Sequence, residues 1–177
     1  MPKLVLLNGP PAVGKSTLAR RYAHDHPLTL VLEIDAVRAL LGSWLEEWER
    51  SGPAARQIAL AMARTHLEAG HDVIVPQLLT RRAFVDQLRA TTEGAGATFH
   101  EFALLDPRET VLGRLEQRSE HETAGSFSAR ELMEKQGNEP GDAYDAFVAA
   151  LRERPDAVVI DDPLSERAYE TLLRLVR

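Results

Sequence analysis

A short stretch near the start of the sequence has the residue types and the spacing of a phosphate-binding loop. The run GPPAVGKS, from Gly9 to Ser16, fits the pattern G-x-x-x-x-G-K-[ST] at every fixed position. In such a loop the backbone N–H groups point at phosphate oxygens, and the positive end of the following helix dipole adds to the attraction. Lys15 is expected to reach the β and γ phosphates, and Ser16 to offer its hydroxyl to Mg²⁺. The motif therefore predicts binding of a nucleoside triphosphate together with Mg²⁺.

The sequence on either side of this motif supports the prediction. Residues Lys3–Asn8 contain a continuous apolar run that predicts a strand buried on both faces. Residues 15–26 have the pattern of a helix, which Pro27 ends. The alternative is a Gly/Pro-rich turn before an ordinary helix, but a strand, a loop and a helix in this register favour phosphate binding. The expected nucleotide contacts are Gly9, Pro10, Pro11, Ala12, Val13, Gly14, Lys15, Ser16 and Thr17, the last of them to an α-phosphate oxygen.

A carboxylate follows the second predicted strand. Asp35 comes directly after the apolar run 28–34, and ligands of parallel α/β sheets bind outside the carboxyl ends of the strands. There Asp35 would accept the proton of an attacking hydroxyl, which is the role of a base in phosphoryl transfer. The alternative is an N-cap for a helix over residues 36–41, and the two roles are compatible.

Other polar and aromatic side chains near this edge are candidate substrate contacts. Arg38, one helical turn beyond Asp35, is expected to hold an anionic substrate or to pair with Glu33. Trp44 and Trp48 are four residues apart and would share one face of a helix. They would either floor a flat substrate pocket or pack in the core. With Gln77 and Arg81, which lie beyond the third predicted strand, the candidate substrate contacts are Asp35, Arg38, Trp44, Gln77 and Arg81.

Two arginines lie on the predicted helix after the fourth strand. Arg114 and Arg118 are one turn apart and share a face of that helix. Arg118 stands at the entrance of a polar, unpatterned stretch at about residues 119–127, which we interpret as a short lid. Guanidinium groups there would neutralise phosphate charge and stack on the base. The alternative is a solvated arginine face paired with Glu116 or Glu120.

Short apolar runs alternate with longer helical patterns along the chain, which is typical of a parallel sheet covered by crossover helices. The expected strands are Lys3–Asn8, 28–34, 72–75, Thr98–Leu105 and 157–160. The expected helices are 15–26, 36–50 with an interruption at Gly42-Ser43, 52–69, 80–91 with Thr80 as N-cap, 106–118, 128–136, 142–153 and 165–176. We therefore expect one α/β domain over residues 1–177, a three-layer P-loop NTPase domain with a five-stranded parallel sheet.

Composition excludes several classes of protein. The 177 residues carry a formal net charge of -6, which disfavours binding to nucleic acid. The absence of cysteine excludes a disulfide framework, a thiolate nucleophile and a cysteine zinc site. No apolar run is long enough for a signal peptide or a membrane span, so we expect a cytoplasmic protein without a membrane partner. The six histidines show no metal-ligand spacing.

The sequence also lacks the marks of other nucleotide-binding proteins. It contains no Asn-Lys-x-Asp guanine motif of a regulatory GTPase and no Ser-Gly-Gly-Gln signature of an ABC-type ATPase. The run AVVIDD at residues 157–162 imitates a Walker B strand, but only fifteen residues follow it. We interpret it as a last strand that ends in a turn. The architecture of a small kinase remains.

Several segments beyond the phosphate loop resemble tunicamycin-resistance-type ATP-binding proteins. They are VIVPQ at Val73–Gln77, then Phe84 and Leu88, FALL at residues 102–105, and ETVLGRL at residues 109–115. The resemblance covers most of the chain up to about Arg118, and the overall plan is also similar to chloramphenicol phosphotransferase and to shikimate and gluconate kinases. It implies a nucleoside-monophosphate-kinase-like fold and ATP-dependent phosphoryl transfer to a hydroxyl of a small molecule, sometimes an antibiotic.

The resemblance also assigns roles to particular residues. Lys15 and Ser16 match nucleotide residues, Asp35 matches the acid after strand two, and Arg114 and Arg118 match lid arginines. The run Val75-Pro76-Gln77 lacks the acid that many P-loop enzymes place there, so Mg²⁺ would depend on Ser16, phosphates, water and Asp35.

The sequence thus predicts an ATP- and Mg²⁺-dependent phosphotransferase that acts on a small hydroxylated molecule, with antibiotics and nucleoside-like compounds as the candidate acceptors. One rival is a resistance protein that binds nucleotide and acts by sequestration or switching, without modifying its small molecule. Another is a polynucleotide 5′-kinase, which the acidic charge and the lack of a basic stripe disfavour.

Overall fold

The structure is a computed structural model, and it describes residues 1–119 and 139–176. The predicted lid and the predicted helix 128–136 lie outside the described residues, apart from the backbone of Ser119. Among the helices of the described part, none is long and apolar enough to cross a membrane.

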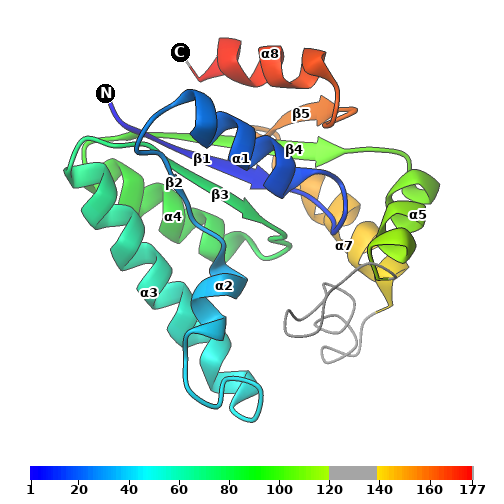
Figure 1. The fold of residues 1–177 in the computed structure, drawn as a ribbon, viewed down its shortest axis with the longest axis horizontal. Helices are drawn as coiled ribbons and strands as arrows, with labels where there is room; N and C mark the ends of the chain where they lie inside the picture. Colours follow the sequence, from blue (N-terminus) through cyan, green and yellow to red (C-terminus); the bar gives the residue numbers. More distant parts are fainter. Residues whose placement is uncertain (120–138, 177) are drawn as a thin grey trace.

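Five parallel strands form the sheet, in the order β2-β3-β1-β4-β5 (Figure 1). Strand β1 lies at the centre because its apolar side chains, Leu4 to Leu7, are fully buried against helices on both faces. The α/β fold with a five-stranded parallel sheet is therefore confirmed. The strands are β1 Lys3–Asn8, β2 Leu30–Val31, β3 Val73–Gln77, β4 Thr98–Leu105 and β5 Val158–Asp161.

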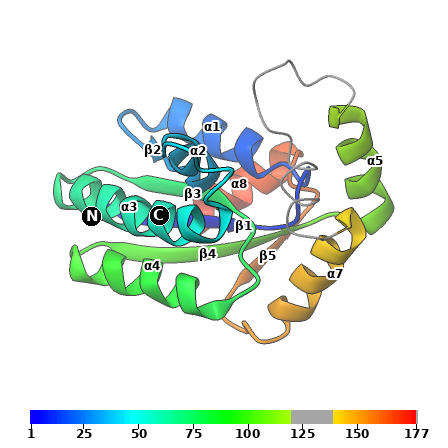
Figure 2. The ribbon, with the colours of Figure 1, turned by 90° about the horizontal axis from the view of Figure 1, so that it is seen from below.

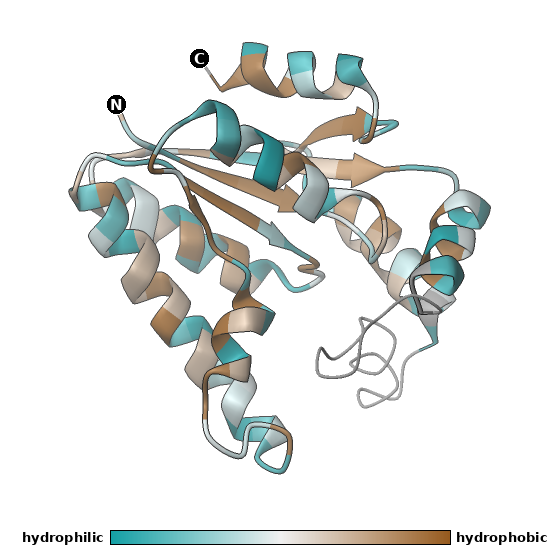
Figure 3. Ribbon diagram, viewed as in Figure 1, coloured by the Kyte–Doolittle hydropathy of each residue, from teal (hydrophilic) through white to brown (hydrophobic). Residues whose placement is uncertain are grey.

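Helices cover both faces of this sheet (Figures 1 and 2). Alternate residues of β1 point to opposite faces: Leu4 and Leu6 pack in one apolar cluster with α3 and α4, and Val5 and Leu7 in another with α1 and α8. Figure 3 shows the strands as mainly hydrophobic and the outer sides of the covering helices as hydrophilic. The helices are α1 Lys15–Asp25, α2 Ile34–Ala39, α3 Trp48–Glu68, α4 Arg82–Gly94, α5 Arg108–Ser119, α7 Pro140–Leu151 and α8 Glu166–Leu175.

The second strand is much shorter than predicted. Pairing ends after Leu32, whose backbone N–H donates to the carbonyl of Ile74, and α2 then begins at Ile34. Ile34 and Val37, three residues apart, are both buried in the cluster with α3. The apolar run 28–34 thus combines the end of a strand with the first buried residue of a helix, and the predicted strand end at residue 34 is wrong.

Pro76 does not end the third strand, as the sequence analysis expected, but continues it in register with Leu7. The carbonyls of Asp72 and Ile74 face β2, so Pro76, two residues further along, faces the same side. Because β2 has already ended there, the missing N–H of Pro76 removes no ladder hydrogen bond.

Helix starts were the least accurate predictions. Helix α3 begins at Trp48 and contains Pro53, whereas the sequence placed its start at residue 52. The buried Ser51 hydroxyl donates to the carbonyl of Trp44, which holds the first turn in place before the proline is reached. Arg81 rather than Thr80 is the N-cap residue of α4.

Candidate active site

The phosphate loop joins β1 to α1 and is held in a narrow range of conformations. Gly14 has a φ of 108°, in the left-handed region, and a Cβ on it would lie 2.7 Å from Cδ2 of Leu164. A Cβ on Gly9 would lie 2.9 Å from the carbonyl oxygen of Leu104. Space therefore requires a glycine at Gly9, where the close atom belongs to the backbone, and backbone geometry requires one at Gly14. Val13 between them is fully buried and anchors the loop.

Lys15 closes over this loop. Its ammonium group donates to the carbonyl oxygens of Gly9 at 2.9 Å and Pro10 at 2.7 Å. Ser16 and Thr17 follow in the first turn of α1, which contains no acidic residue. The first N–H groups of a helix lack intrahelical partners. The loop thus gathers a cation, N–H donors and hydroxyls, which is the chemistry that binds phosphate.

Asp35 lies in the first turn of α2, two residues beyond the N-cap residue Glu33. It is neither the end of the strand nor the N-cap, so both local descriptions given to it from the sequence are wrong. Asp35 nevertheless contacts the edge of the sheet at the strand ends, because Nε2 of Gln77 donates to its Oδ2 at 3.3 Å. Gln77 is the last residue of β3 and pairs with Asn8, the last residue of β1 before the phosphate loop.

Arg38 is buried rather than exposed to a ligand. Its Nε donates to Oγ of Ser51 at 2.8 Å, and its guanidinium carbon lies 3.4 Å from the ring centroid of Trp48. Burial lowers the pKa of Arg38, and the charge of Asp35 partly opposes this. The predicted pairing of Glu33 with Arg38 is not what the structure shows, because Glu33 pairs with Arg20 at 3.5 Å.

The two tryptophans do not share a helix face. Trp44 lies in the turn before α3, and Trp48 is the first residue of α3. Their ring centroids are 6.0 Å apart, and the guanidinium carbon of Arg38 lies over both rings. Of the two interpretations, these contacts favour packing over a flat substrate pocket.

The predicted arginines of the fifth helix have different outcomes. Arg114 Nη1 lies 2.6 Å from Oδ2 of Asp106, the residue that follows β4. Tyr144 of α7 donates its hydroxyl to the carbonyl of the same aspartate at 2.9 Å. Arg114 is therefore held by an acid that the sequence analysis did not consider. The side chain of Arg118 lies outside the described residues, and its role stays a prediction.

Helix α5 nevertheless packs against the phosphate loop. Leu115 and Ala143 of α7 are buried together, and Ala12 of the loop and Leu78 pack against them. Arg81, the exposed N-cap of α4, lies three residues beyond Leu78. The loop apex, α5 and the residues after β3 therefore share one small apolar contact.

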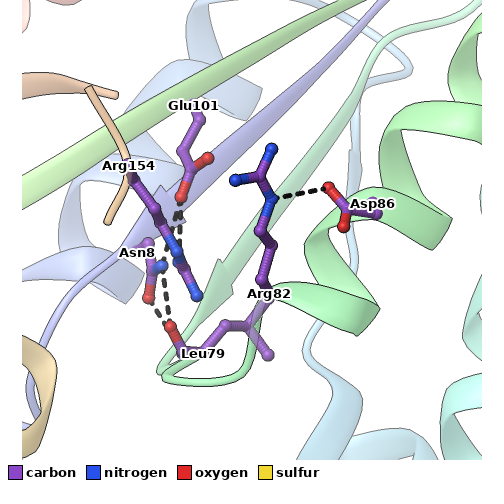
Figure 4. Close-up of polar contacts among 6 residues, drawn as sticks. All are labelled: Asn8, Leu79, Arg82, Asp86, Glu101 and Arg154. Atoms are coloured by element: carbon purple, nitrogen blue, oxygen red, sulfur yellow. Dashed lines mark hydrogen bonds and ion pairs between the residues drawn. The ribbon is translucent and has the colours of Figure 1, made fainter. Parts of the chain in front are cut away.

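A buried polar network lies beside the loop and was missed from the sequence (Figure 4). Asn8 bonds to the backbone of Leu79 and to Glu101, and Arg154 pairs with Glu101 at 3.0 Å. Both side chains of this ion pair are 6% exposed. One signal was available: Glu101 is an acid within the apolar strand Thr98–Leu105, and a buried acid requires a partner. Nothing in the sequence indicated which residue that partner would be.

A P-loop between β1 and α1, on a parallel sheet of this order, defines a P-loop kinase-like α/β fold. The sequence matches a family described as an AAA domain, AAA_33, over residues 4–140, which is well over half of the chain. The chain belongs to this family of P-loop kinase domains. No curated protein sequence matched it.

Solved structures share the fold over nearly the whole chain. The tunicamycin resistance protein of Deinococcus radiodurans is 21% identical with a TM-score of 0.62, and the match covers 99% of this chain and 96% of that one. A gluconokinase of Sinorhizobium meliloti is 20% identical with a TM-score of 0.60, covering 99% and 93%. The APS kinase of Mycobacterium tuberculosis, in complex with AMPPNP and APS, is 19% identical with a TM-score of 0.62, covering 98% and 96%. At these identities the likeness shows a common fold.

Proposed function

We propose that this protein is an ATP-dependent kinase that transfers the γ-phosphate to a hydroxyl of a small molecule, with antibiotics and nucleoside-like compounds as the candidate acceptors. The observation that carries the proposal is the common location of two chemical groups. The phosphate loop follows Asn8, and the Asp35 carboxylate is bonded to Gln77, which is paired with Asn8 across neighbouring strands. A phosphate-binding group and a proton acceptor therefore start from adjacent points of one sheet edge.

In this proposal the loop binds the triphosphate. The ammonium of Lys15 exchanges its two carbonyl partners for the β and γ phosphates, and the first-turn N–H groups of α1 bind phosphate oxygens. In the described residues, no group of three or more His, Cys, Asp or Glu could hold a metal ion. The Ser16 hydroxyl and the phosphates are the proposed ligands of Mg²⁺, which when bound would neutralise phosphate charge.

Asp35 acts on the acceptor. The acceptor oxygen forms a bond to the γ-phosphorus, the bond from that phosphorus to the bridging oxygen breaks, and ADP leaves. The proton of the acceptor hydroxyl passes to Asp35. Because Gln77 donates to Oδ2, it orients the carboxylate and leaves Oδ1 to accept this proton.

The remaining candidates divide between binding and support. Arg81 is exposed beside the edge and is the proposed charged contact to an acceptor. Arg38 and Trp44, which contact each other, support the segment that carries Asp35. Two of the structures with this fold are named as a gluconokinase and an APS kinase, which supports a small-molecule acceptor.

The test combines ATP titration with a search for phosphorylated products. The protein is incubated with ATP, Mg²⁺ and a panel of antibiotics and nucleosides, and mass spectrometry detects an added phosphate. Lys15→Ala should weaken ATP binding about 10- to 100-fold, because charge-assisted hydrogen bonds contribute roughly 1.5–3 kcal/mol. Asp35→Asn should bind ATP as the wild type does but lower transfer by about 10²- to 10⁴-fold.

Each rival has its own result in this experiment. Binding of ATP and of a panel compound without any phosphorylated product would support sequestration instead. Phosphorylation of a short 5′-hydroxyl oligonucleotide, and of no small molecule, would support a polynucleotide kinase. Unchanged ATP affinity in Lys15→Ala would contradict the assignment of the phosphate loop itself.

A further inference from the structure

Three consecutive residues at the end of the third strand connect all parts of the candidate site. Gln77 donates to Asp35, Leu78 packs in the apolar contact with Ala12 and Leu115, and Leu79 bonds to Asn8. We call residues 77–79 the bridging segment. It contacts the proposed base, the apex of the phosphate loop and the residue from which that loop starts. A displacement of this segment would therefore change the distance between base and phosphate.

Asn8 fixes the bridging segment with two hydrogen bonds. Its Oδ1 accepts from the backbone N–H of Leu79 at 2.8 Å, and its Nδ2 donates to the carbonyl oxygen of Leu79 at 3.1 Å. Asn8 is 1% exposed and is the last residue of β1, directly before Gly9. One buried side chain thus holds the start of the phosphate loop against the segment that orients Asp35.

Glu101, paired with Arg154, favours the same orientation of the Asn8 amide as the backbone of Leu79 does (Figure 4). Nδ2 of Asn8 lies 3.4 Å from Oε1 of Glu101, and Nη1 of Arg154 lies 3.0 Å from the same oxygen. A carboxylate paired with arginine can only accept, so it favours the NH₂ side of the amide and leaves Oδ1 for Leu79. A half-turn of the amide would lose both bonds to Leu79 and would turn Oδ1 towards the carboxylate.

Burial of this network has a cost in folding stability. Nη2 of Arg154 is buried and has no hydrogen-bond partner among residues 1–119 and 139–176, although Nη1 of the same guanidinium is bonded to Glu101. Apolar side chains of similar volume often replace buried ion pairs without loss of stability. We therefore assign the buried acid beside the Asn8 amide a role in positioning that amide rather than in stabilising the fold.

We propose that Asn8 is a positioning residue for phosphoryl transfer. It sets the bridging segment, and through Gln77 the Asp35 carboxylate, at a fixed distance from the phosphate loop, in an orientation that Leu79 and Glu101 both favour. The inference rests on the proposed function. A displacement of about 1 Å at a reacting group can lower a rate by about 10²-fold, which is the scale of effect that Asn8 controls.

The experiment removes the donor side of the Asn8 amide. Asn8→Asp keeps the acceptor for the N–H of Leu79 but places a carboxylate oxygen against the carbonyl of Leu79 and against Glu101, and adding Glu101→Gln removes only the repulsion between the two carboxylates. Tyr22→Phe is the matched control, because it removes one partly buried hydrogen bond, to Asp72, which precedes the first residue of β3, whereas Gln77 is the last residue of that strand. ATP with Mg²⁺ is the probe and water is the acceptor. Single-turnover phosphate release gives the rate, calorimetry gives ATP affinity, and thermal melting monitors the fold.

The expected result is a division between rate and affinity. Asn8→Asp should lower the rate about 10- to 100-fold with ATP affinity nearly unchanged, and the double variant should recover part of that loss because the repulsion between two carboxylates is removed. Tyr22→Phe should lower the melting temperature and leave the rate as in the wild type. Gln77→Ala, which leaves the buried network intact, should lower the rate to a similar degree.

Three results would overturn the inference. ATP affinity could fall as far as the rate, which would make Asn8 a support of the phosphate loop only. The double variant could recover nothing, which would remove the role of Glu101. If Asn8→Asp does not fold, an unchanged rate in Gln77→Ala overturns it. Failure of the proposed function is distinct, since the wild type itself would then release no phosphate from ATP, whether or not it binds the nucleotide.

Discussion

Gly14 offers a test in which backbone strain can be separated from side-chain contact. Its φ is 108°, and an added Cβ would lie 2.7 Å from Cδ2 and 3.2 Å from Cγ of Leu164. Gly70, after α3, has a φ of 88°, but a Cβ there would meet nothing within 4 Å. Gly14→Ala and Gly70→Ala therefore share left-handed strain and differ in contact. Only Gly14 also belongs to the phosphate loop.

The expected magnitudes follow from these two terms. Left-handed strain should cost about 1–2 kcal/mol in each variant, which lowers the melting temperature by about 2–8 °C in a protein of this size. Overpacking adds about 1–3 kcal/mol at Gly14 alone. The lower end applies, because Leu164 is 47% exposed and its side chain can turn away. A Gly14→Ala, Leu164→Ala double variant should recover the contact term and keep the strain.

Thermal melting with and without ATP and Mg²⁺ measures both stability and binding. Gly14→Ala should lower ATP affinity about tenfold or more, because a shifted loop misdirects its N–H donors and one charge-assisted hydrogen bond contributes about 1.5–3 kcal/mol. Gly70→Ala should leave affinity unchanged. If Gly14→Ala has the same melting temperature as Gly70→Ala and binds ATP as tightly as the wild type, then the loop neither approaches Leu164 closely nor binds phosphate.

Two further predictions concern the buried charges and a histidine. Arg154→Met should lower stability by about 3–5 kcal/mol, because Glu101 then stays buried without its cation. Adding Glu101→Leu should recover most of it in urea unfolding, and an equal loss in both variants would contradict the burial of the pair. Burial, then Lys3, lowers the pKa of His100 below its ordinary value of 6.5, and Asp72 partly opposes them. The folded state thus prefers the neutral ring, so stability from His100 is present above about pH 6.5 and decreases as pH falls through the folded pKa. His100→Gln should reduce the difference in unfolding free energy between pH 7 and pH 5, and an unchanged difference would refute the assignment.

The central strands could be predicted from the sequence because one physical property determines them. Lys3–Asn8 and Thr98–Leu105 have the predicted bounds, since both contain an apolar run, Leu4 to Leu7 and Phe102 to Leu104, that is buried in the sheet. The prediction of the second strand failed because one apolar run contains first a strand and then the buried face of α2. The early start of α3 depends on the contacts of Arg38 and Ser51, which sequence spacing alone does not show.

In the candidate site, too, the features that depend on local sequence could be predicted and the long-range contacts could not. The phosphate loop is contiguous, so its glycine positions and the placement of Lys15 follow from local geometry. The network around Asn8 joins residues that are 71, 93 and 53 positions apart, for Asn8 to Leu79, Asn8 to Glu101 and Glu101 to Arg154. A single sequence carries no pairing information at such separations. The sequence identified Asp35 as a site residue but placed it wrongly at a strand end or an N-cap, because its contact with Gln77 depends on the short second strand.

The two sides of the candidate site also differ in what holds them. Gln77 and Asn8 are partners in a parallel ladder, so backbone hydrogen bonds set the spacing between these two residues, and side-chain bonds from Asn8 to Leu79 and from Gln77 to Asp35 complete the connection to the carboxylate. Arg114 depends instead on a helix that contacts the loop through the side chains of Leu115 and Ala12 and is tied to the sheet through Asp106. Side-chain packing adjusts to a substitution more readily than the hydrogen-bond ladder of a sheet does. A substitution at Leu115 should therefore move the arginine helix relative to the phosphate loop while the distance from Asp35 to that loop stays fixed.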